Sequence, residues 1–125
     1  MKRIIETNLA PTPIGAYSQA VSCMGETIFI SGQISLNLDR QLVGTDIESQ
    51  TEQTIKNLEG ILKSQGLTLD NVVKTTCLLS DMANFTKFNE VYGKFFGESK
   101  PARATFGVVE LPLKALVEIE AIAVK

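Results

Sequence analysis

Histidine and tryptophan are absent from this 125-residue chain, and cysteine occurs only twice. Without histidine, the chain lacks the commonest metal ligand and the usual general base at neutral pH. Cys23 and Cys77 are too few for a disulfide framework, and we expect both thiols to be free. Any chemistry must therefore come from arginine, acidic residues, lysine, tyrosine, cysteine or the backbone.

Long apolar runs and clusters of basic residues are missing as well. No stretch of about 18 apolar residues could span a membrane, and the N-terminal segment MKRIIETNLAPTPIG lacks the apolar region of a signal peptide. The net charge is −2, and the twelve lysines and arginines are scattered, so no basic stripe could follow a phosphate backbone. We expect a cytoplasmic protein with neither a membrane nor nucleic acid as its primary partner.

The composition that remains is that of an ordinary globular protein. Apolar residues make up 44% of the chain and charged residues 21%, with no low-complexity segment, which argues against disorder. A chain of this length can bury one sizeable core. We expect residues 1–125 to form a single domain.

Strand and turn signals occupy the first third of the chain. A strand is predicted over residues 2–6, followed by a proline-rich loop. The segment YSQAVSCMGETIFISGQI then predicts two strands joined by a turn at residues 24–26. The second of these strands, Thr27 to Ser31, ends at Gly32, where a glycine often marks a bulge or a close approach.

Two amphipathic helices are predicted in the middle of the chain. The first begins at the capping box Thr45–Glu48 and ends near Gln65, with Gly66 as a left-handed cap. The second has Asp81 as N-cap and ends before Gly97. Residues at helical spacing predict the core-facing stripes: Ile47, Ile55, Leu58, Ile61 and Leu62, then Phe85, Phe88, Val91, Tyr92, Phe95 and Phe96.

Three further strands complete the pattern, within residues 72–81, 103–109 and 116–124. This order of elements predicts an α+β fold of two layers, in which both helices cover one face of a mixed six-stranded sheet. The other face of the sheet would remain uncovered, and large exposed apolar patches are uncommon in soluble monomers. We therefore expect a homo-oligomer with closed symmetry.

Arg103 is a charged residue at an unusual place, inside a predicted strand. Side chains alternate along a strand, so Arg103, Thr105 and Gly107 share one side and Phe106 lies on the other. A guanidinium is permanently charged, and its fork fits the two oxygens of a carboxylate. Arg103 therefore either binds an anionic ligand or forms an ion pair with Glu110 or with an acidic residue of another subunit.

Glu118 and Glu120 lie on one side of the last predicted strand and alternate with apolar residues. A partly buried carboxylate needs a hydrogen-bonding partner, or its pKa rises, and a general acid or base for neutral pH arises in this way. The alternative is a solvated strand face or an ion pair between subunits. A slip of one residue in register would move Glu118 to the opposite face of the sheet.

Other polar residues carry less information. Tyr17, Ser31 and Asn89 could line a cleft, but each alone is equally consistent with half-buried packing. Cys77 lies in an apolar run with no histidine in the chain, which indicates an inert buried thiol.

Several segments, in this order, carry a family resemblance: APTPIGAYSQAV, ISGQI, VVKTTCLLSDMANFTKFNEVY, KPARAT and LPLKALVEIEAIA. Over essentially its whole length the sequence resembles the RidA (YjgF-type) reactive-intermediate deaminases. The resemblance implies a chorismate-mutase-like α+β fold and a homotrimer with sites in the clefts between subunits. It also implies hydrolysis of 2-imino acids such as 2-iminobutanoate and 2-iminopropanoate, in equilibrium with 2-enamino acids such as 2-aminoacrylate, to 2-oxo acids and ammonia, without a cofactor or metal.

The resemblance assigns roles residue by residue. Arg103 matches the arginine that holds the substrate carboxylate, and Glu118 the glutamate that positions or activates water. The remaining expected substrate-binding residues are Tyr17, Gly32, Asn89 and Thr105.

The sequence departs from close relatives after the arginine, with Ala104-Thr105 and then Phe106-Gly107. Thr105 and Gly107 are expected to leave room for a short substrate, so the departures concern the preferred substrate side chain. The competing hypothesis is a non-catalytic protein that binds small carboxylates or regulates a partner. The acidic balance of charge disfavours a ribonuclease role.

Overall fold

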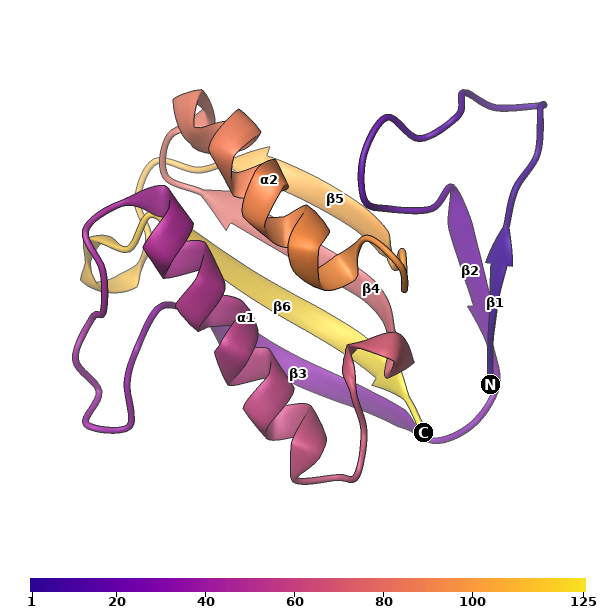
Figure 1. Ribbon diagram of the computed structural model, residues 1–125, viewed down its shortest axis with the longest axis horizontal. Coiled ribbons are helices and arrows are strands. Elements are labelled where there is room, and N and C mark those ends of the chain that lie inside the picture. Colours follow the sequence, from indigo (N-terminus) through magenta and orange to yellow (C-terminus); the bar gives the residue numbers. More distant parts are fainter.

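The computed structural model describes all residues from 1 to 125 and contains six strands and two helices (Figure 1). The strands take the segments rich in β-branched residues, and the helices take those with apolar residues at helical spacing. In chain order the elements are β1 (Lys2–Ile5), β2 (Ala20–Cys23), β3 (Thr27–Gln33), α1 (Ile47–Lys63), β4 (Val72–Leu79), α2 (Phe85–Phe96), β5 (Ala102–Gly107) and β6 (Val117–Val124).

The strands form two sheets, so the predicted single six-stranded sheet is wrong. β3, β6, β4 and β5 lie side by side in that order, with β4 and β5 parallel and the other neighbours antiparallel. β1 and β2 form a separate antiparallel hairpin that stands apart from the larger sheet (Figure 1). The chain turns between β2 and β3 at Gly25, whose φ of 136° suits glycine, and this turn carries β2 away from β3.

Contacts at both of its ends tie the hairpin to the rest of the chain. Lys2 Nζ donates hydrogen bonds to the carbonyl oxygens of Val72, at 2.9 Å, and Ser99, at 2.5 Å. Burial lowers the pKa of this lysine. The backbone N–H of Ser18 donates to the carbonyl of Pro101 at 3.3 Å. The segment that precedes β2 is therefore held beside the start of β5.

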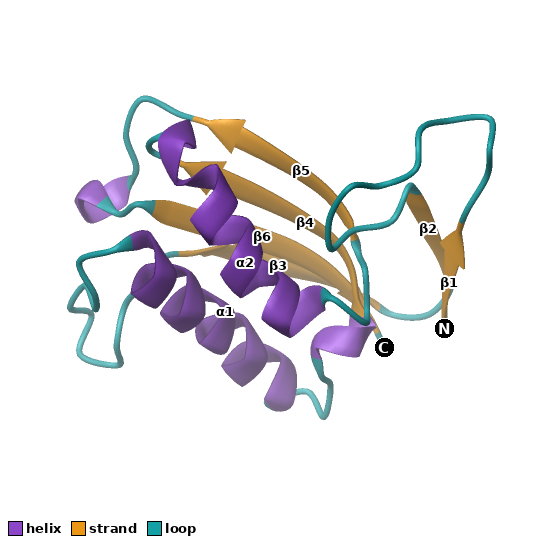
Figure 2. Cartoon of the chain, turned by 45° about the horizontal axis from the view of Figure 1, so that its top comes forward, coloured by secondary structure: helices purple, strands orange, loops and turns teal.

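Both helices pack on the same side of the four-stranded sheet, as the sequence predicts (Figure 2). We call this side the helix face and the other side the open face. Side chains alternate between the two along each strand. The helix face carries the buried residues Thr75, Cys77, Leu79, Val117, Ile119 and Ala121. The open face carries Phe29, Thr76, Leu78, Phe106, Glu118 and Glu120.

The core lies between the helices and the helix face, and most predicted core residues are buried there: Ile47, Ile55, Leu58, Leu62, Phe88, Val91, Tyr92 and Phe96. The prediction that Ile61 faces the core is wrong, because this residue lies on the outer side of α1 with 36% of its surface exposed. Phe85 and Phe95 are half-buried. Polar Gln50 is buried instead, and its side chain donates to the Gly44 carbonyl and accepts from the Leu116 N–H.

The start of α1 agrees with the sequence to within one residue, but α1 ends at Lys63, two residues before Gln65, and α2 begins only at Phe85, four residues after its predicted N-cap Asp81. The N-cap of α1 is Asp46 rather than Thr45, since Asp46 Oδ1 accepts the Ser49 N–H at 2.8 Å. Gly66, at φ 73°, ends the helix in the left-handed conformation, as predicted. Asp81 caps a short 3₁₀ turn that runs directly into α2, and its carboxylate accepts the Ala83 N–H. No helix is long and apolar enough to cross a membrane.

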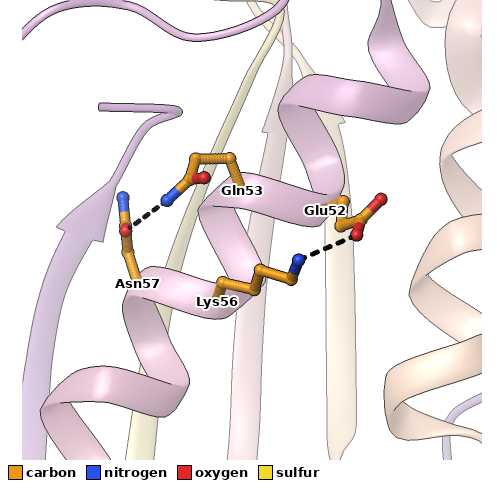
Figure 3. A network of polar contacts seen from close by, with 4 residues as sticks. All are labelled: Glu52, Gln53, Lys56 and Asn57. Carbon is orange, nitrogen blue, oxygen red and sulfur yellow. Dashed lines mark hydrogen bonds and ion pairs between the residues drawn. The ribbon is translucent and has the colours of Figure 1, made fainter. Parts of the chain in front are cut away.

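Polar side chains on α1 interact with one another and with the backbone of residues 34–36, which follow β3. Lys56 forms an ion pair with Glu52 at 3.0 Å, and Gln53 donates to Asn57 Oδ1 at 2.9 Å (Figure 3). Asn57 Nδ2 in turn donates to the carbonyl oxygens of Ile34 and Leu36. The side chain of Asn57 thus fixes the exit of β3 against α1.

Candidate functional site

Arg103 lies on the helix face of the edge strand β5, opposite Thr75 of β4. Its guanidinium carbon is 4.8 Å from the ring centroid of Tyr92 and 5.1 Å from that of Tyr17. Phe85 and Phe88 add two more rings within 6 Å of the cation, the range in which aromatic faces attract it. We call Arg103, its four rings and Asn89 the arginine cage.

Asn89 of α2 is the single hydrogen-bonding partner of the guanidinium, and its Oδ1 accepts from Arg103 Nη1 at 2.8 Å. The only ion pair of the chain is Glu52–Lys56, so the predicted alternative, an ion pair of Arg103 with Glu110, does not form. A guanidinium has five N–H donors, and the protein uses one of them. The cage therefore holds the cation in place without neutralising its charge.

The side chains beneath the arginine cage are buried. The hydroxyls of Thr75 and Tyr92 share a hydrogen bond of 2.7 Å, and burial raises the pKa of the tyrosine. Burial also raises the pKa of Cys77 to about 12, so this thiol stays protonated at neutral pH, and the prediction that it is buried is confirmed. Thr105, two residues from Arg103 on the same face, has a buried hydroxyl with no hydrogen-bonding partner in the chain.

The space beside Gly107 is not free, contrary to the expectation from the sequence. A Cβ atom at Gly107 would lie 2.7 Å from Cγ of Met82, because the side chain of Met82 packs over the glycine. Met82 comes from the 3₁₀ turn before α2, and the strand pattern could not place it there. Room for a ligand near Arg103 therefore does not come from Gly107.

Glu118 lies on the open face of β6, level with Leu78 of β4. Its carboxylate packs directly against Gly32 of β3, where a Cβ atom would overlap Oε2. The ladder between β3 and β6 has a bulge between Ile30 and Gln33, which contains this glycine. The prediction of a bulge or a close approach at Gly32 is confirmed, and the group that approaches is Glu118.

Arg103 and Glu118 lie on opposite faces of the sheet. Arg103 is level with Thr75 and Ala121, both buried on the helix face, whereas Glu118 is level with Leu78 and projects from the other side. The structure thus brings Arg103 together with Tyr17 and Asn89, with Thr105 two residues along the same face of β5. It separately brings Glu118 together with Gly32. One small ligand cannot touch both groups within one chain.

Sequence reasoning missed the aromatic walls of the arginine cage. Phe88 and Tyr92 were predicted as core, and they are fully buried, but they also present their rings to Arg103. Their helical spacing contains no signal for the second role, because it does not say which strand lies beneath the helix. No group of three or more acidic, cysteine or histidine side chains could hold a metal ion.

The protein is a small α+β protein with an arginine that has no carboxylate partner in the chain, and comparison identifies its family. Residues 7–125 match the family described as Endoribonuclease L-PSP. The chain belongs to this family, to which the RidA (YjgF) proteins also belong. The resemblance noted in the sequence is thereby confirmed.

Three relatives illustrate the range of names within the family. A RutC family protein of Pyrococcus horikoshii is 48% identical over 100% of this chain and 99% of its own. The 2-iminobutanoate/2-iminopropanoate deaminase of Mus musculus is 48% identical over 100% of this chain and 93% of its own. The crystal structure of Escherichia coli TdcF with bound serine superimposes with a TM-score of 0.75 at 36% identity, covering 98% of each chain.

Proposed function

We propose that the protein is a cytoplasmic enzyme that hydrolyses 2-imino acids, with 2-iminobutanoate and 2-iminopropanoate as its substrates, to 2-oxo acids and ammonia. The observation that carries this proposal is Arg103, held by four rings and Asn89 with no carboxylate partner in the chain. A small carboxylate is the natural partner of such a guanidinium. The deaminase name of the mouse relative and the serine bound to TdcF support the same class of ligand.

The active form is proposed to be a homotrimer in which each site lies between two subunits. Arg103 and Glu118 lie on opposite faces of the sheet, so a ligand that meets both must meet two copies of the chain. The open face also exposes Phe29 and Phe106, with 78% and 53% of their surfaces accessible, which a neighbouring copy would cover.

The proposed reaction begins with the substrate carboxylate on the free N–H groups of Arg103, while Tyr17, Asn89 and Thr105 line the same side. Glu118 of a second copy orients a water molecule towards the imine carbon and accepts one of its protons. Attack forms a C–O bond and a tetrahedral carbinolamine. Glu118 then returns its proton to nitrogen, the C–N bond breaks as the C=O bond forms, and the hydroxyl proton leaves with the ammonia as ammonium, which leaves the 2-oxo acid. A protonated imine is already electrophilic, so orientation supplies most of the catalysis.

A turnover assay with one variant tests the proposal. An amino acid oxidase acting on 2-aminobutanoate generates 2-iminobutanoate, and semicarbazide traps whatever imine remains. We expect the wild type to deplete the imine and Arg103→Ala to match buffer alone. The control is Arg3→Ala, which removes an exposed arginine of β1 and should retain wild-type activity. Equal rates for the wild type and Arg103→Ala would refute the proposal.

The same assay decides between the enzyme and a binding protein. The competing function, a non-catalytic protein that binds small carboxylates, uses the same arginine cage. Tight binding of 2-oxobutanoate without any turnover of the imine would favour that function. The family description names an endoribonuclease, but the net charge of −2 and the scattered basic residues favour a small anion over a polyanion.

A further inference from the structure

The loop between β1 and β2 carries Tyr17, which supplies one wall of the arginine cage, yet the loop itself has no regular structure. It runs over residues 6–19 and includes Pro11 and Pro13. Most of its residues are exposed, among them Leu9 and Ile14, with 92% and 96% of their surfaces accessible. A segment with so few buried contacts needs specific hydrogen bonds to keep one conformation.

The side chain of Gln19 supplies four of these hydrogen bonds. Its Nε2 donates to the carbonyl oxygens of Thr7 at 2.9 Å, Ala10 at 3.0 Å and Pro11 at 2.9 Å. Its Oε1 accepts the backbone N–H of Thr7 at 2.7 Å. One carboxamide thus closes the loop onto the residue that precedes β2.

The closed loop leads directly to Tyr17. The N–H of Tyr17 donates to the carbonyl of Gly15 at 2.9 Å, and its hydroxyl accepts the Ile14 N–H at 3.5 Å. On the other side, the Ser18 N–H donates to the carbonyl of Pro101, two residues before Arg103. The position of the Tyr17 ring over the guanidinium therefore depends on both ends of the loop.

We propose that Gln19 is a positioning residue that orders residues 7–11 and thereby holds Tyr17 against Arg103. Its kinetic consequence rests on the proposed function. Gln19 touches neither Arg103 nor the expected position of a ligand, so it acts through Tyr17. The β1–β2 ladder pairs four residues with four through the backbone and does not need the Gln19 side chain, so its loss should free the loop without unfolding the hairpin.

Hydrogen exchange read by mass spectrometry tests the first step without any substrate. In Gln19→Ala we expect exchange of the amides of residues 6–19 to accelerate about tenfold, while peptides of β4 and β6 keep their rates. Gln19→Glu should behave like Gln19→Ala, because a carboxylate cannot donate to the three carbonyls. The matched control is Gln65→Ala, which removes an exposed glutamine that bonds only the neighbouring Ser64 hydroxyl. Unchanged exchange in Gln19→Ala would overturn the proposal.

Nuclear magnetic resonance tests the second step. Aromatic rings shift the side-chain protons of Arg103, and displacement of Tyr17 should remove part of that shift in Gln19→Ala and in Tyr17→Leu to a similar extent. The proposed link between the two residues would be overturned if the Arg103 protons kept their full ring-induced shift in Gln19→Ala but lost part of it in Tyr17→Leu.

Kinetics test the third step. Arg103 is proposed to hold the carboxylate in the ground state and the transition state alike, so in Gln19→Ala we expect KM to rise about tenfold with kcat nearly unchanged. The double variant with Tyr17→Leu should be no worse than the poorer single variant, since the two residues act as one unit. Effects that multiply would mean that Gln19 acts independently of Tyr17. A wild type without turnover would refute the proposed function, and the exchange and resonance data would still decide the role of Gln19.

Discussion

The arginine cage on the helix face and the Glu118–Gly32 pair on the open face are built in opposite ways. The cage is finished within one chain, because α2, β5 and the loop before β2 enclose the guanidinium with rings and an amide. Glu118 lies on the open face of the sheet, with Gly32 and Leu78 as neighbours and both helices on the other face. The proposed binding of a carboxylate by Arg103 thus needs one chain, whereas the proposed hydrolysis needs a second surface over Glu118.

The largest expected effect comes from removing Arg103 in one variant and Glu118 in another. Arg103→Ala and Glu118→Gln should each lower kcat/KM by roughly 100-fold or more, because one loses the carboxylate anchor and the other the proton acceptor. Refolded together in equal amounts, the two variants should regain about a quarter of wild-type activity, since that fraction of interfaces pairs an intact Arg103 with an intact Glu118.

Each variant refolded alone is the control for this mixture. A mixture that stays inactive would contradict a site shared between copies. So would a wild-type protein that light scattering shows to be a monomer and that is nevertheless fully active.

The next effect should come from neutralising the arginine cage. Asn89→Asp places a carboxylate where an amide oxygen now accepts from Arg103 at 2.8 Å, so the protein itself would occupy the cation. We expect KM to rise by roughly 30-fold, because the substrate must compete with a permanent ion pair. Asn89→Ala removes the hydrogen bond but keeps the charge free, so its KM should rise less. Equal effects of the two variants would show that the free charge is not what matters.

A smaller effect should come from the open face through Gly32. In Gly32→Ala the new methyl group meets the end of a flexible side chain, so Glu118 moves aside at little cost in stability. We expect kcat to fall by about tenfold with an almost unchanged melting temperature.

Gly60→Ala is the matched control for that substitution. Gly60 lies within α1 with nothing within 4 Å of a Cβ atom, so alanine there should stabilise the fold by about 0.5 to 1 kcal/mol and leave kcat unchanged. A normal kcat in Gly32→Ala would mean that the position of Glu118 against the bulge does not matter.

The last comparison separates the helix face of the sheet from the open face through the pH dependence of stability. The thiol of Cys77 has its pKa raised from 9.0 to about 12 in the folded chain, so the folded state keeps a proton that the unfolded state loses. Stability is therefore fully present below pH 9 and falls as pH rises towards 12, by up to about 1.4 kcal/mol per pH unit from this group. Tyr92, whose pKa is also raised by burial, acts in the same direction.

Melting temperatures between pH 8 and 11 check this expectation. Cys77→Ala should flatten the decline, whereas Cys23→Ala, which removes an exposed thiol, should leave it as in the wild type. The same decline in both variants would contradict the assignment to Cys77.

The layers of the fold were predictable from periodicity, and the division of the sheet was not. The apolar residues at helical spacing from Phe88 to Phe96 show which face of α2 is apolar, and the apolar residues of β4 do the same for that strand. These residues are buried because apolar surfaces pack together. Whether β2 continues the sheet beyond β3 depends on the path of the chain at Gly25 and on which strand edge it meets. Those are long-range choices that local patterns do not contain.

The resemblance assigned the residues of the candidate site, but it did not predict which of them lie together in one chain. Alternation along β5 and β6 correctly predicted that Arg103 and Phe106 lie on opposite sides and that Glu118 and Glu120 share one. It could not relate the two strands to each other, because the register between them is set by β4, which lies between them. The filling of the space at Gly107 by Met82 depends on a turn outside the strand.

The bulge at Gly32 also matters for how this chain avoids aggregation. β3 is an edge strand of the four-stranded sheet, and a straight edge with free N–H and carbonyl groups would template the addition of strands from other molecules. The interruption between Ile30 and Gln33 breaks the regular spacing of those groups along β3. The glycine beside Glu118 therefore also makes this edge of the sheet a poor template for strands from other molecules.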